Sequence, residues 1–250
     1  MVWLLNNVYD VEHRAYFMSE KKMELTPLKI RSHGASSLMQ YDEWYTQYIE
    51  MTGLLPFVQL VSRSTPNLNA AAVTSLIARW RPETHSFHLR TGEMTVTLQD
   101  ISMITALPIE GKPLCMSTDS EGWRQQMEAL IGKNAPWMWL KALTVFDNKF
   151  SWGSAALAYL YRQLDDACHR TTKDGGVGGC MLLLSVWSWE RLPVGRPKSS
   201  QWNTWDDHGN LLRQPTWAYK WDLVSEVASE ANLLYKQYTN EMDSLTQLHV

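Results

Sequence analysis

Apolar residues recur every three or four positions along most of the chain, which is the spacing of amphipathic helices. Between residues 40 and 51 this repeat is carried by Tyr41, Trp44, Tyr45, Tyr48 and Met51. A second helix is predicted over AAAVTSLIARW, because Asn69 stands at its start as an N-cap and Pro82 follows its end. These patterns predict that helices dominate the first third of the chain.

The apolar period changes to two between residues 85 and 98, where the chain reads HSFHLRTGEMTVTL. Strand-like runs on both sides of RTGE predict an antiparallel hairpin that turns near Thr91-Gly92, where glycine accepts a positive φ. Thr97 then stands as the N-cap of another helix, with Asp100 three positions later in its first turn and Pro108 after its end.

Further helices are predicted over residues 119–131, 136–146, 152–168, 180–190 and 219–245. Apolar residues nearly encircle 152–168 and 180–190, so we expect both helices to be buried near each other, with Leu183 and Trp187 almost inaccessible. The glycine-rich DGGVGG is expected to be a connector between them, and Asp165-Asp166 to be solvated. The predicted fold class is mainly α (α+β): one helical domain over residues 1–250, with a small β-hairpin near 85–98.

Composition supports a folded domain and disfavours a general nucleic-acid binder. The chain is 45% hydrophobic and holds 13 tryptophans, most of which should be core or interface anchors. Its 23 basic and 26 acidic residues give a net charge of −3, whereas an autonomous nucleic-acid binder should be basic. A local basic patch at Arg191, Arg196 and Lys198 stays open, although such a cluster is more often a solvated loop.

The number of cysteines and the short lengths of the apolar runs indicate where in the cell the protein lies. Three cysteines form neither a disulfide framework nor a four-cysteine zinc site, and they fit the reducing nucleus or cytoplasm. The N-terminal MVWLLNNVYDVEHR is not typical of a secretory signal. The longest apolar run, residues 180–187, is far shorter than the roughly 20 residues of a membrane span. We therefore expect an intracellular protein, nuclear or cytoplasmic, without membrane contact.

No group of residues predicts a reaction. His85 and His88 would point to opposite faces of a strand, so hydrogen bonding at the hairpin is favoured over a metal site. Cys168, beside His169, is interpreted as a buried structural thiol. DGGVGG lacks the Gly-Lys-Ser/Thr ending of a phosphate-binding loop, and Lys141 lacks the surroundings of a Schiff-base lysine. We predict no catalytic residues, no cofactor and no metal, and hence no enzyme.

Several longer motifs, in a fixed order, resemble the plant mobile domain family. They are WRPETHSFHL at 80–89, GEMTVTLQDISMI at 92–104, LPIEGKPL at 107–114, SWGSAALAYLYRQLDDA at 151–167, GGCMLLLSVWSWERLPVGRP at 178–197 and PTWAYKW at 215–221. From these motifs we select a candidate structural or interaction set: Trp80, Arg81, Pro82, His85, His88, Trp187, Trp189 and Arg191.

The resemblance implies a domain that transposons carry and that host genes have adopted. Host members are nuclear factors linked to meristem maintenance, transposon silencing and genome integrity, and they work with a plant-specific serine/threonine phosphatase of the type-7 family. Some members are labelled aminotransferase-like, but the family provides no catalytic residues to carry over. The resemblance therefore implies a non-enzymatic nuclear interaction module. The alternatives are a transposon-borne accessory protein that contacts DNA and an enzyme whose site forms only in the fold.

The chain departs from the family at one internal position. Members carry several dozen residues between the segments that match 123–132 and 134–146, whereas here Gly132 is followed directly by Lys133. Members also continue beyond the C-terminal helix. We therefore expect a domain that is shortened near 132–133 and truncated at its C-terminus. A lost core segment should expose apolar neighbours, namely Trp123, Trp137, Trp139 or Leu140.

Overall fold

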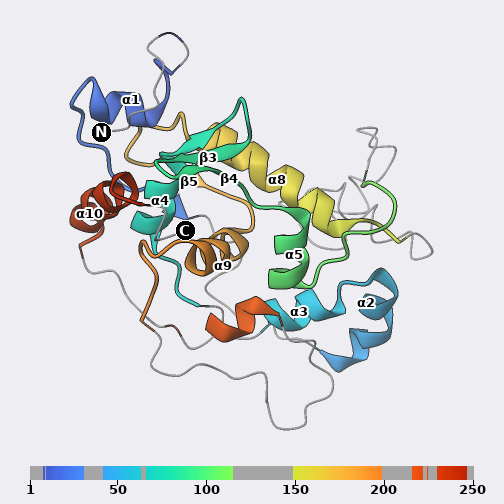
Figure 1. The fold of residues 1–250 in the computed structure, drawn as a ribbon. Helices are drawn as coiled ribbons and strands as arrows, with labels where there is room; N and C mark the ends of the chain where they lie inside the picture. The colour runs from blue at the N-terminus through green and yellow to red at the C-terminus, as the bar shows by residue number, and fades with distance from the viewer. Residues whose placement is uncertain are drawn as a thin grey trace.

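The computed structural model describes residues 8, 10–30, 42–62, 66–114, 149–198, 216–221, 224 and 230–246. Helices dominate these ranges, and two small sheets accompany them (Figure 1). This confirms the predicted mainly α class with a minor β component. Within the described ranges, no helix is both long enough and apolar enough to cross a bilayer. The predicted helices at 119–131 and 136–146, and the four apolar residues expected to be exposed, lie outside the described residues.

The elements are short and irregularly spaced along the chain. The helices are α1 (Arg14–Ser19), η1 (Glu43–Tyr45), α2 (Thr46–Thr52), α3 (Leu55–Val61), α4 (Ala70–Ile77), α5 (Leu98–Thr105), α8 (Trp152–Ala167), α9 (Met181–Arg191), η2 (Trp217–Trp221) and α10 (Ala231–Asp243), of which η1 and η2 are 3-10 helices. The strands are β1 (Lys29–Ile30), β2 (Trp80–Arg81), β3 (Ser86–Leu89), β4 (Gly92–Met94) and β5 (Gly176–Val177).

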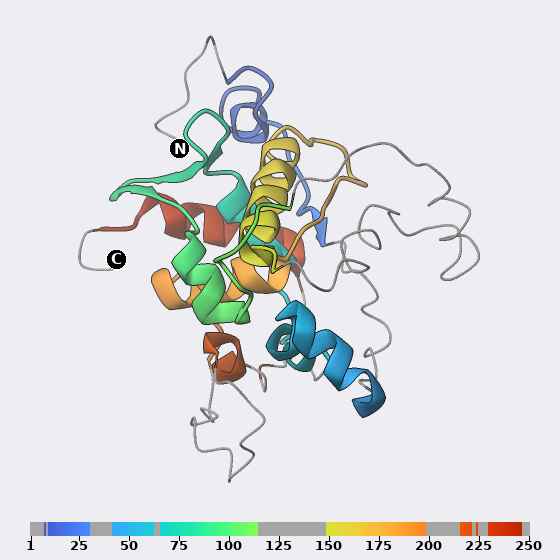
Figure 2. The same ribbon diagram turned by 90° about the vertical axis from the view of Figure 1, so that its right-hand side faces the viewer.

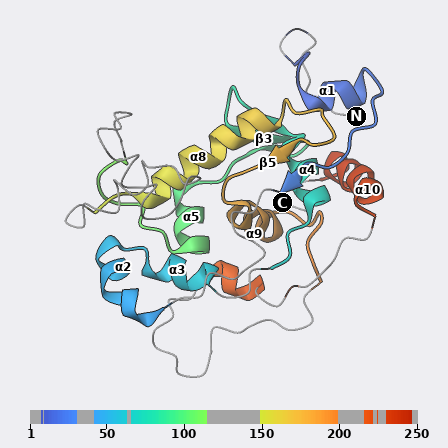
Figure 3. The ribbon, with the colours of Figure 1, turned by 180° about the vertical axis from the view of Figure 1, so that it is seen from behind.

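Helix α9 lies at the centre of the core (Figures 1 and 3). Every residue from 181 to 189 is buried, and Leu183 and Trp187 are only 0% and 1% exposed, which confirms their predicted inaccessibility. Helix α8 is different, because it buries one side and leaves residues such as Tyr159 exposed. The expectation that α8 is mainly buried is therefore wrong. The two helices belong to one core, and both pack against α5.

The β elements include one strand more than the sequence predicted around the hairpin. Strands β3 and β4 are antiparallel, with Leu89 opposite Gly92, so the predicted hairpin is confirmed. Strand β2 adds to the other side of β3 and places Trp80 opposite Phe87. Strand β5 pairs in parallel with β1, so part of the glycine-rich segment is a strand as well as a connector.

The helix caps follow the local sequence. Asn69 Oδ1 accepts hydrogen bonds from the first turn of α4, at 3.0 and 3.1 Å. Thr97 and Asp100 form a reciprocal capping box at the start of α5. Helix α5 ends with Ala106 in the left-handed conformation, two residues before Pro108. The Asn69 cap, the Thr97–Asp100 pair and the end of α5 before Pro108 were predicted from nearby residues, whereas the conformation of Ala106 was not.

Two peripheral layers cover the core on different sides. Helix α10 packs along α4, whereas α3 packs on α5 and α2 packs on α3 at the edge of the molecule (Figures 1 and 2). The helix predicted over 40–51 is present within the described residues as η1 and α2. Its aromatic side does not enter the core, however, because Trp44 is 65% exposed.

Candidate functional site

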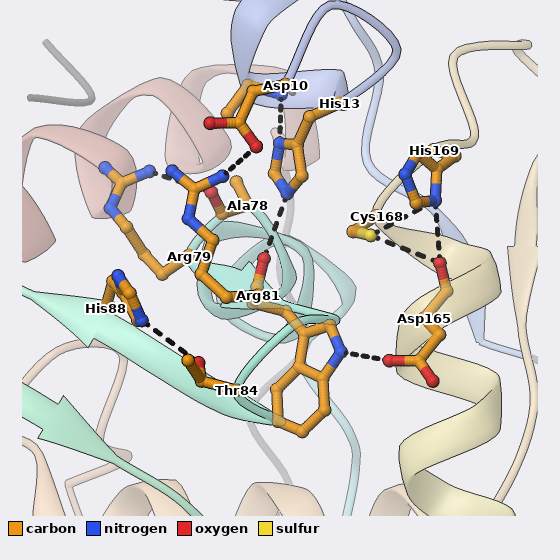
Figure 4. A network of polar contacts seen from close by, with 12 residues as sticks. Asp10, His13, Ala78, Arg79, Arg81, Thr84, His88, Asp165, Cys168 and His169 are labelled. Carbon is orange, nitrogen blue, oxygen red and sulfur yellow. Dashed lines mark hydrogen bonds and ion pairs between the residues drawn. The ribbon is translucent and has the colours of Figure 1, made fainter. Parts of the chain in front are cut away.

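Trp80 is the centre of the candidate motif and is completely buried. Its ring centroid lies 4.8 Å from that of Phe87 and 5.2 Å from that of Tyr161. The indole Nε1 donates a 2.8 Å hydrogen bond to Asp165 Oδ1 on α8 (Figure 4). The expectation that Asp165 would be merely solvated is therefore wrong, whereas the neighbouring Asp166 side chain is 55% exposed.

The two histidines of the motif pair with different carboxylates. His85 has a positive φ of 48°, stacks on Tyr161 with a 6° interplanar angle, and places Nε2 3.3 Å from Asp165 Oδ2. His88 Nε2 lies 3.1 Å from Thr84 Oγ1 and 3.3 Å from Glu93 Oε1. His88 thus makes its polar contacts at the hairpin, as expected, whereas the ring of His85 contacts α8. Among the described residues, no three His, Cys, Asp or Glu side chains are grouped to hold a metal ion.

Arg81 and His13 connect the motif to the N-terminal segment. Arg81 Nη1 donates to Asp10 Oδ1 at 2.7 Å, with both side chains less than one-tenth exposed. His13 Nδ1 accepts from the Ala15 amide at 3.1 Å, so the ring proton is on Nε2, which donates to the Trp80 carbonyl at 3.0 Å. Burial, reinforced by the charge of Arg81, lowers the pKa of His13 to about 3, and the ring is neutral.

Two further buried arginines connect the ends of the chain to this region. Arg79 Nη2 donates to the Thr239 carbonyl at 3.1 Å and to Asp243 Oδ1 at 2.7 Å, both on α10. Burial lowers the pKa of Arg79, and the Asp243 carboxylate opposes that shift. Arg14 donates to Tyr235 Oη at 3.2 and 3.3 Å. A buried guanidinium requires such acceptors. These contacts join α1 to α10, and α10 to the residues between α4 and β2.

Cys168 has a histidine neighbour but not the properties of a nucleophile. Its Sγ lies 3.4 Å from His169 Nδ1 and donates to the Asp165 carbonyl at 3.2 Å. Burial and the nearby negative charge of Asp165 raise the pKa of Cys168 to about 12. Because the thiolate is the reactive form, this thiol is unreactive near neutral pH. The interpretation of Cys168 as a structural residue agrees with this geometry.

The other motif residues lie along α9 and have separate partners. Trp187 lies beneath the hairpin, with its ring 5.4 Å from Phe87. Trp189 packs 5.1 Å from Trp221 of η2. Arg191 Nη2 donates to Asp100 Oδ1 at 2.8 Å. Although burial alone raises the pKa of Asp100, hydrogen bonds from Arg191 and from Thr97 hold it below its ordinary value.

The structure therefore divides the eight predicted residues into two places. Trp80, Arg81, Pro82, His85 and His88 lie together in β2, β3 and the turn that joins these two strands, and Trp187 lies beneath them. Trp189 and Arg191 lie with η2 and the first turn of α5.

Sequence reasoning missed the partners of these residues. They are Asp10, which binds Arg81, and His13 and Asp165, which bind Trp80. Sequence reasoning also missed two neighbours of the motif that bind other residues: Arg79 donates to Asp243, and Glu190 accepts hydrogen bonds from Lys220 and Trp221. A tryptophan and two arginines at the end of a buried helix signal that acceptors are required. Nothing in a single sequence says which distant carboxylates supply them.

Fold and site together define a mainly helical domain in which buried tryptophan, arginine and histidine groups hold distant segments together. The chain belongs to the plant mobile domain family, whose model matches residues 56–141 and 136–250. It is similar to three proteins of Arabidopsis thaliana. One, a serine/threonine-protein phosphatase 7 long form homolog, is 35% identical over 187 residues, covering 52% of this chain and 14% of that protein.

The second and third relatives are proteins named for meristem maintenance. Protein MAINTENANCE OF MERISTEMS is 28% identical, over 53% of this chain and 39% of that protein. Protein MAIN-LIKE 2 is 29% identical, over 53% of this chain and 28% of that protein. About half of this chain matches each relative, and the matched region makes up only 14% to 39% of the relative's own length. No solved structure matches it.

Proposed function

We propose that this chain is a non-enzymatic interaction module that acts in the nucleus with a serine/threonine phosphatase of the type-7 family. The observation that carries the proposal is the relative named as a phosphatase 7 long form homolog, in which the matched region is 14% of the protein. In that relative, the matched region belongs to a polypeptide that is named for a phosphatase. We infer that the same kind of domain, as a separate chain, contacts such a phosphatase.

The geometry of the site supports an interaction role over catalysis. Asp165 is engaged by Trp80 and His85, and Asp10 is engaged by Arg81. These polar groups bind one another across elements, whereas a catalytic set converges on a space that a substrate can enter. Their contacts hold the domain together, which leaves its surface to make the functional contacts.

The process is inferred from the relatives' names. Similarity to MAINTENANCE OF MERISTEMS and MAIN-LIKE 2 supports a role in meristem maintenance. Transposon silencing and genome integrity are the nuclear activities that we assign to the same module by analogy. Localisation to the nucleus is part of this proposal, because each of these activities concerns chromosomes.

Affinity purification from plant nuclei tests the proposal. The tagged full chain is expected to co-purify a type-7 phosphatase, identified by mass spectrometry, and a matched tag without the chain is the control. Recombinant chain and phosphatase should then bind each other directly in a titration. Recovery of the chain only from cytoplasmic extract, or no direct binding to the phosphatase, would overturn the proposal.

We also propose that the domain is internally shortened near residues 132–133, where the family resemblance predicts that several dozen residues are missing. The family model matches in two pieces whose ends meet within residues 136–141. The 187-residue match to the phosphatase homolog takes in only 52% of a 250-residue chain, so the relative has residues without a counterpart here. Sequencing of cDNA amplified across codons 115–150 is expected to reveal a longer transcript that encodes the additional segment. A longer transcript would identify this chain as the product of a spliced variant, and finding only the short form would contradict that explanation.

A further inference from the structure

The helices η1 and α2 carry a group of exposed aromatic side chains that takes no part in the site described above. The α2 aromatic face consists of Trp44, Tyr45, Tyr48 and Met51, which are 65%, 51%, 41% and 54% exposed. The Trp44 ring lies 5.0 Å from Tyr45, at an interplanar angle of 87°, and 5.8 Å from Tyr48. Exposed large apolar side chains that gather in one place mark interaction surfaces.

Acidic side chains flank this face. Glu43, Gln47 and Glu50 are spaced i, i+4 and i+7, so they form a stripe beside that of Trp44, Tyr48 and Met51. Glu43, Gln47 and Glu50 are all exposed, as is Asp42 immediately before them. Residues 42–62 contain three acidic residues and no lysine, arginine or histidine. The charge around the rings of Trp44, Tyr45 and Tyr48 is therefore negative. The faces of aromatic rings also attract cations.

We propose that the α2 aromatic face binds an arginine-bearing basic peptide segment of a partner protein. A guanidinium stacks on an aromatic face at about 6 Å or less, and it also pairs with carboxylates. The molecule already contains such stacking, with Arg14 5.6 Å from the centroid of Tyr235 and Arg191 5.9 Å from that of Trp217. In the proposed complex, Trp44 and Tyr45 supply the rings, and Glu43 and Glu50 supply the charge.

Charge disfavours the other occupants of such a face. Nucleic acid and anionic membranes would bring negative charge to Glu43 and Glu50, and a second copy would bring the same acidic stripe. The face also precedes residue 56, where the match to the family model begins. The inference rests on the proposed interaction role, but it adds a surface that the family model does not include and the chemistry of its ligand.

Fluorescence anisotropy with the purified full chain provides the test. The probe is a fluorescein-labelled peptide of repeated arginine-glycine-serine triplets, and its matched control replaces each arginine by citrulline, which is neutral but nearly isosteric. We expect binding of the arginine peptide, weakening as salt rises above about 0.15 M, and at least tenfold weaker binding of the citrulline peptide.

Three variants locate the binding. Trp44→Ala is expected to weaken binding at least fivefold, and Glu43→Gln with Glu50→Gln severalfold, with a shallower salt dependence. Leu233→Ala, at a 61% exposed apolar side chain on α10, should leave binding unchanged. Circular dichroism should show the same thermal unfolding for all variants, because the replaced side chains are exposed.

Several results would overturn the proposal. They are no binding at ~1 mM peptide, equal binding of the citrulline peptide, or unchanged binding by the Trp44 variant. A Trp44→Ala change that alters oligomeric state, or binding to phosphatidylserine vesicles, would assign the face to a second copy or a membrane instead. If the chain co-purifies the phosphatase from nuclei but does not bind the arginine peptide, this inference is contradicted and the proposed function is not.

Discussion

The indole Nε1 of Trp80 and the carboxylate Oδ1 of Asp165 are 2.8 Å apart, although 85 positions separate the two residues in the chain. This contact attaches β2 to α8 and gives a fully buried indole its acceptor. A buried donor left without its acceptor costs the full desolvation penalty of the group.

Replacement of Asp165 tests the strength of that contact. We expect Asp165→Ala to lower the free energy of unfolding by about 1–3 kcal/mol, because Trp80 Nε1 loses its acceptor. Asp165→Asn keeps an acceptor oxygen and should cost less. Asp166→Ala, at a 55% exposed side chain, is the matched control and should stay within about 0.5 kcal/mol of the parent. Urea titrations give all three values, and equal losses for the two alanine variants would contradict the assigned role.

The Asp10–Arg81 pair should show strong coupling. Arg81→Met removes the guanidinium that pairs with the buried Asp10 carboxylate, so the expected loss of unfolding free energy is about 3–5 kcal/mol. Asp10→Leu combined with Arg81→Met removes both charges and should cost less than the sum of the single changes. A double-mutant cycle measured by denaturant unfolding checks this. Strict additivity would show that the pair does not interact.

His13 should make stability depend on pH. Its pKa is lowered from 6.5 to about 3, chiefly by burial, so below pH 6.5 the unfolded chain binds a proton that the folded chain does not. Stability is therefore complete above that pH and falls as pH drops from 6.5 towards 3, by roughly 1.4 kcal/mol per pH unit. His13→Asn, which retains an N-capping side chain, should flatten this slope relative to the parent in urea titrations. Parallel pH profiles for the two proteins would rule out His13 as the cause.

Cys168 should resist alkylation until the domain unfolds. With a pKa of about 12, only about one thiol in ten thousand is ionised at pH 8, and the side chain is also buried. Iodoacetamide followed by peptide mass spectrometry should find Cys168 unmodified in the folded chain and modified in urea. Rapid labelling of the native protein would contradict the assigned burial.

Gly195 should not tolerate a larger side chain. It has a positive φ of 62°, and a Cβ at this position would lie 2.7 Å from Ala72 Cβ on α4. We expect Gly195→Ala to cost about 1–3 kcal/mol through this overpacking. Adding Ala72→Gly, which removes the opposing atom, should recover part of the loss despite its own helix cost of about 1 kcal/mol. If the second change only adds to the loss, the strain arises elsewhere.

Features set by neighbouring residues could be predicted from the sequence. The Asn69 cap, the Thr97–Asp100 capping box and the hairpin each depend on groups within a few positions of one another. Strand β2 was missed because its two residues are too few to show a period. The spacing of apolar residues shows that a helix is amphipathic but not what covers its apolar side, so the exposure of Trp44 could not be predicted from it.

Only part of the candidate site could be predicted, because the partners of its residues lie far away in the sequence. Trp80, Arg81 and His85 were identified, but their partners come from the N-terminal segment and from α8. Asp165 lies beside Asp166 in a helix, and only the three-dimensional packing separates the carboxylate that binds an indole from the one that meets water. Polar pairing between distant elements depends on tertiary geometry, so no local pattern encodes it.

The contacts of Arg14 and Arg79 also constrain the order in which the domain can form during translation. Arg14 meets Tyr235, which is 221 residues later, and Arg79 meets Asp243, which is 164 residues later. Both arginines are therefore synthesised long before the residues of α10 with which they pair. The contacts of α10 with Arg14, Arg79 and α4 can form only once α10 has emerged, so a chain that stops earlier lacks them and is more open to chaperones and proteases.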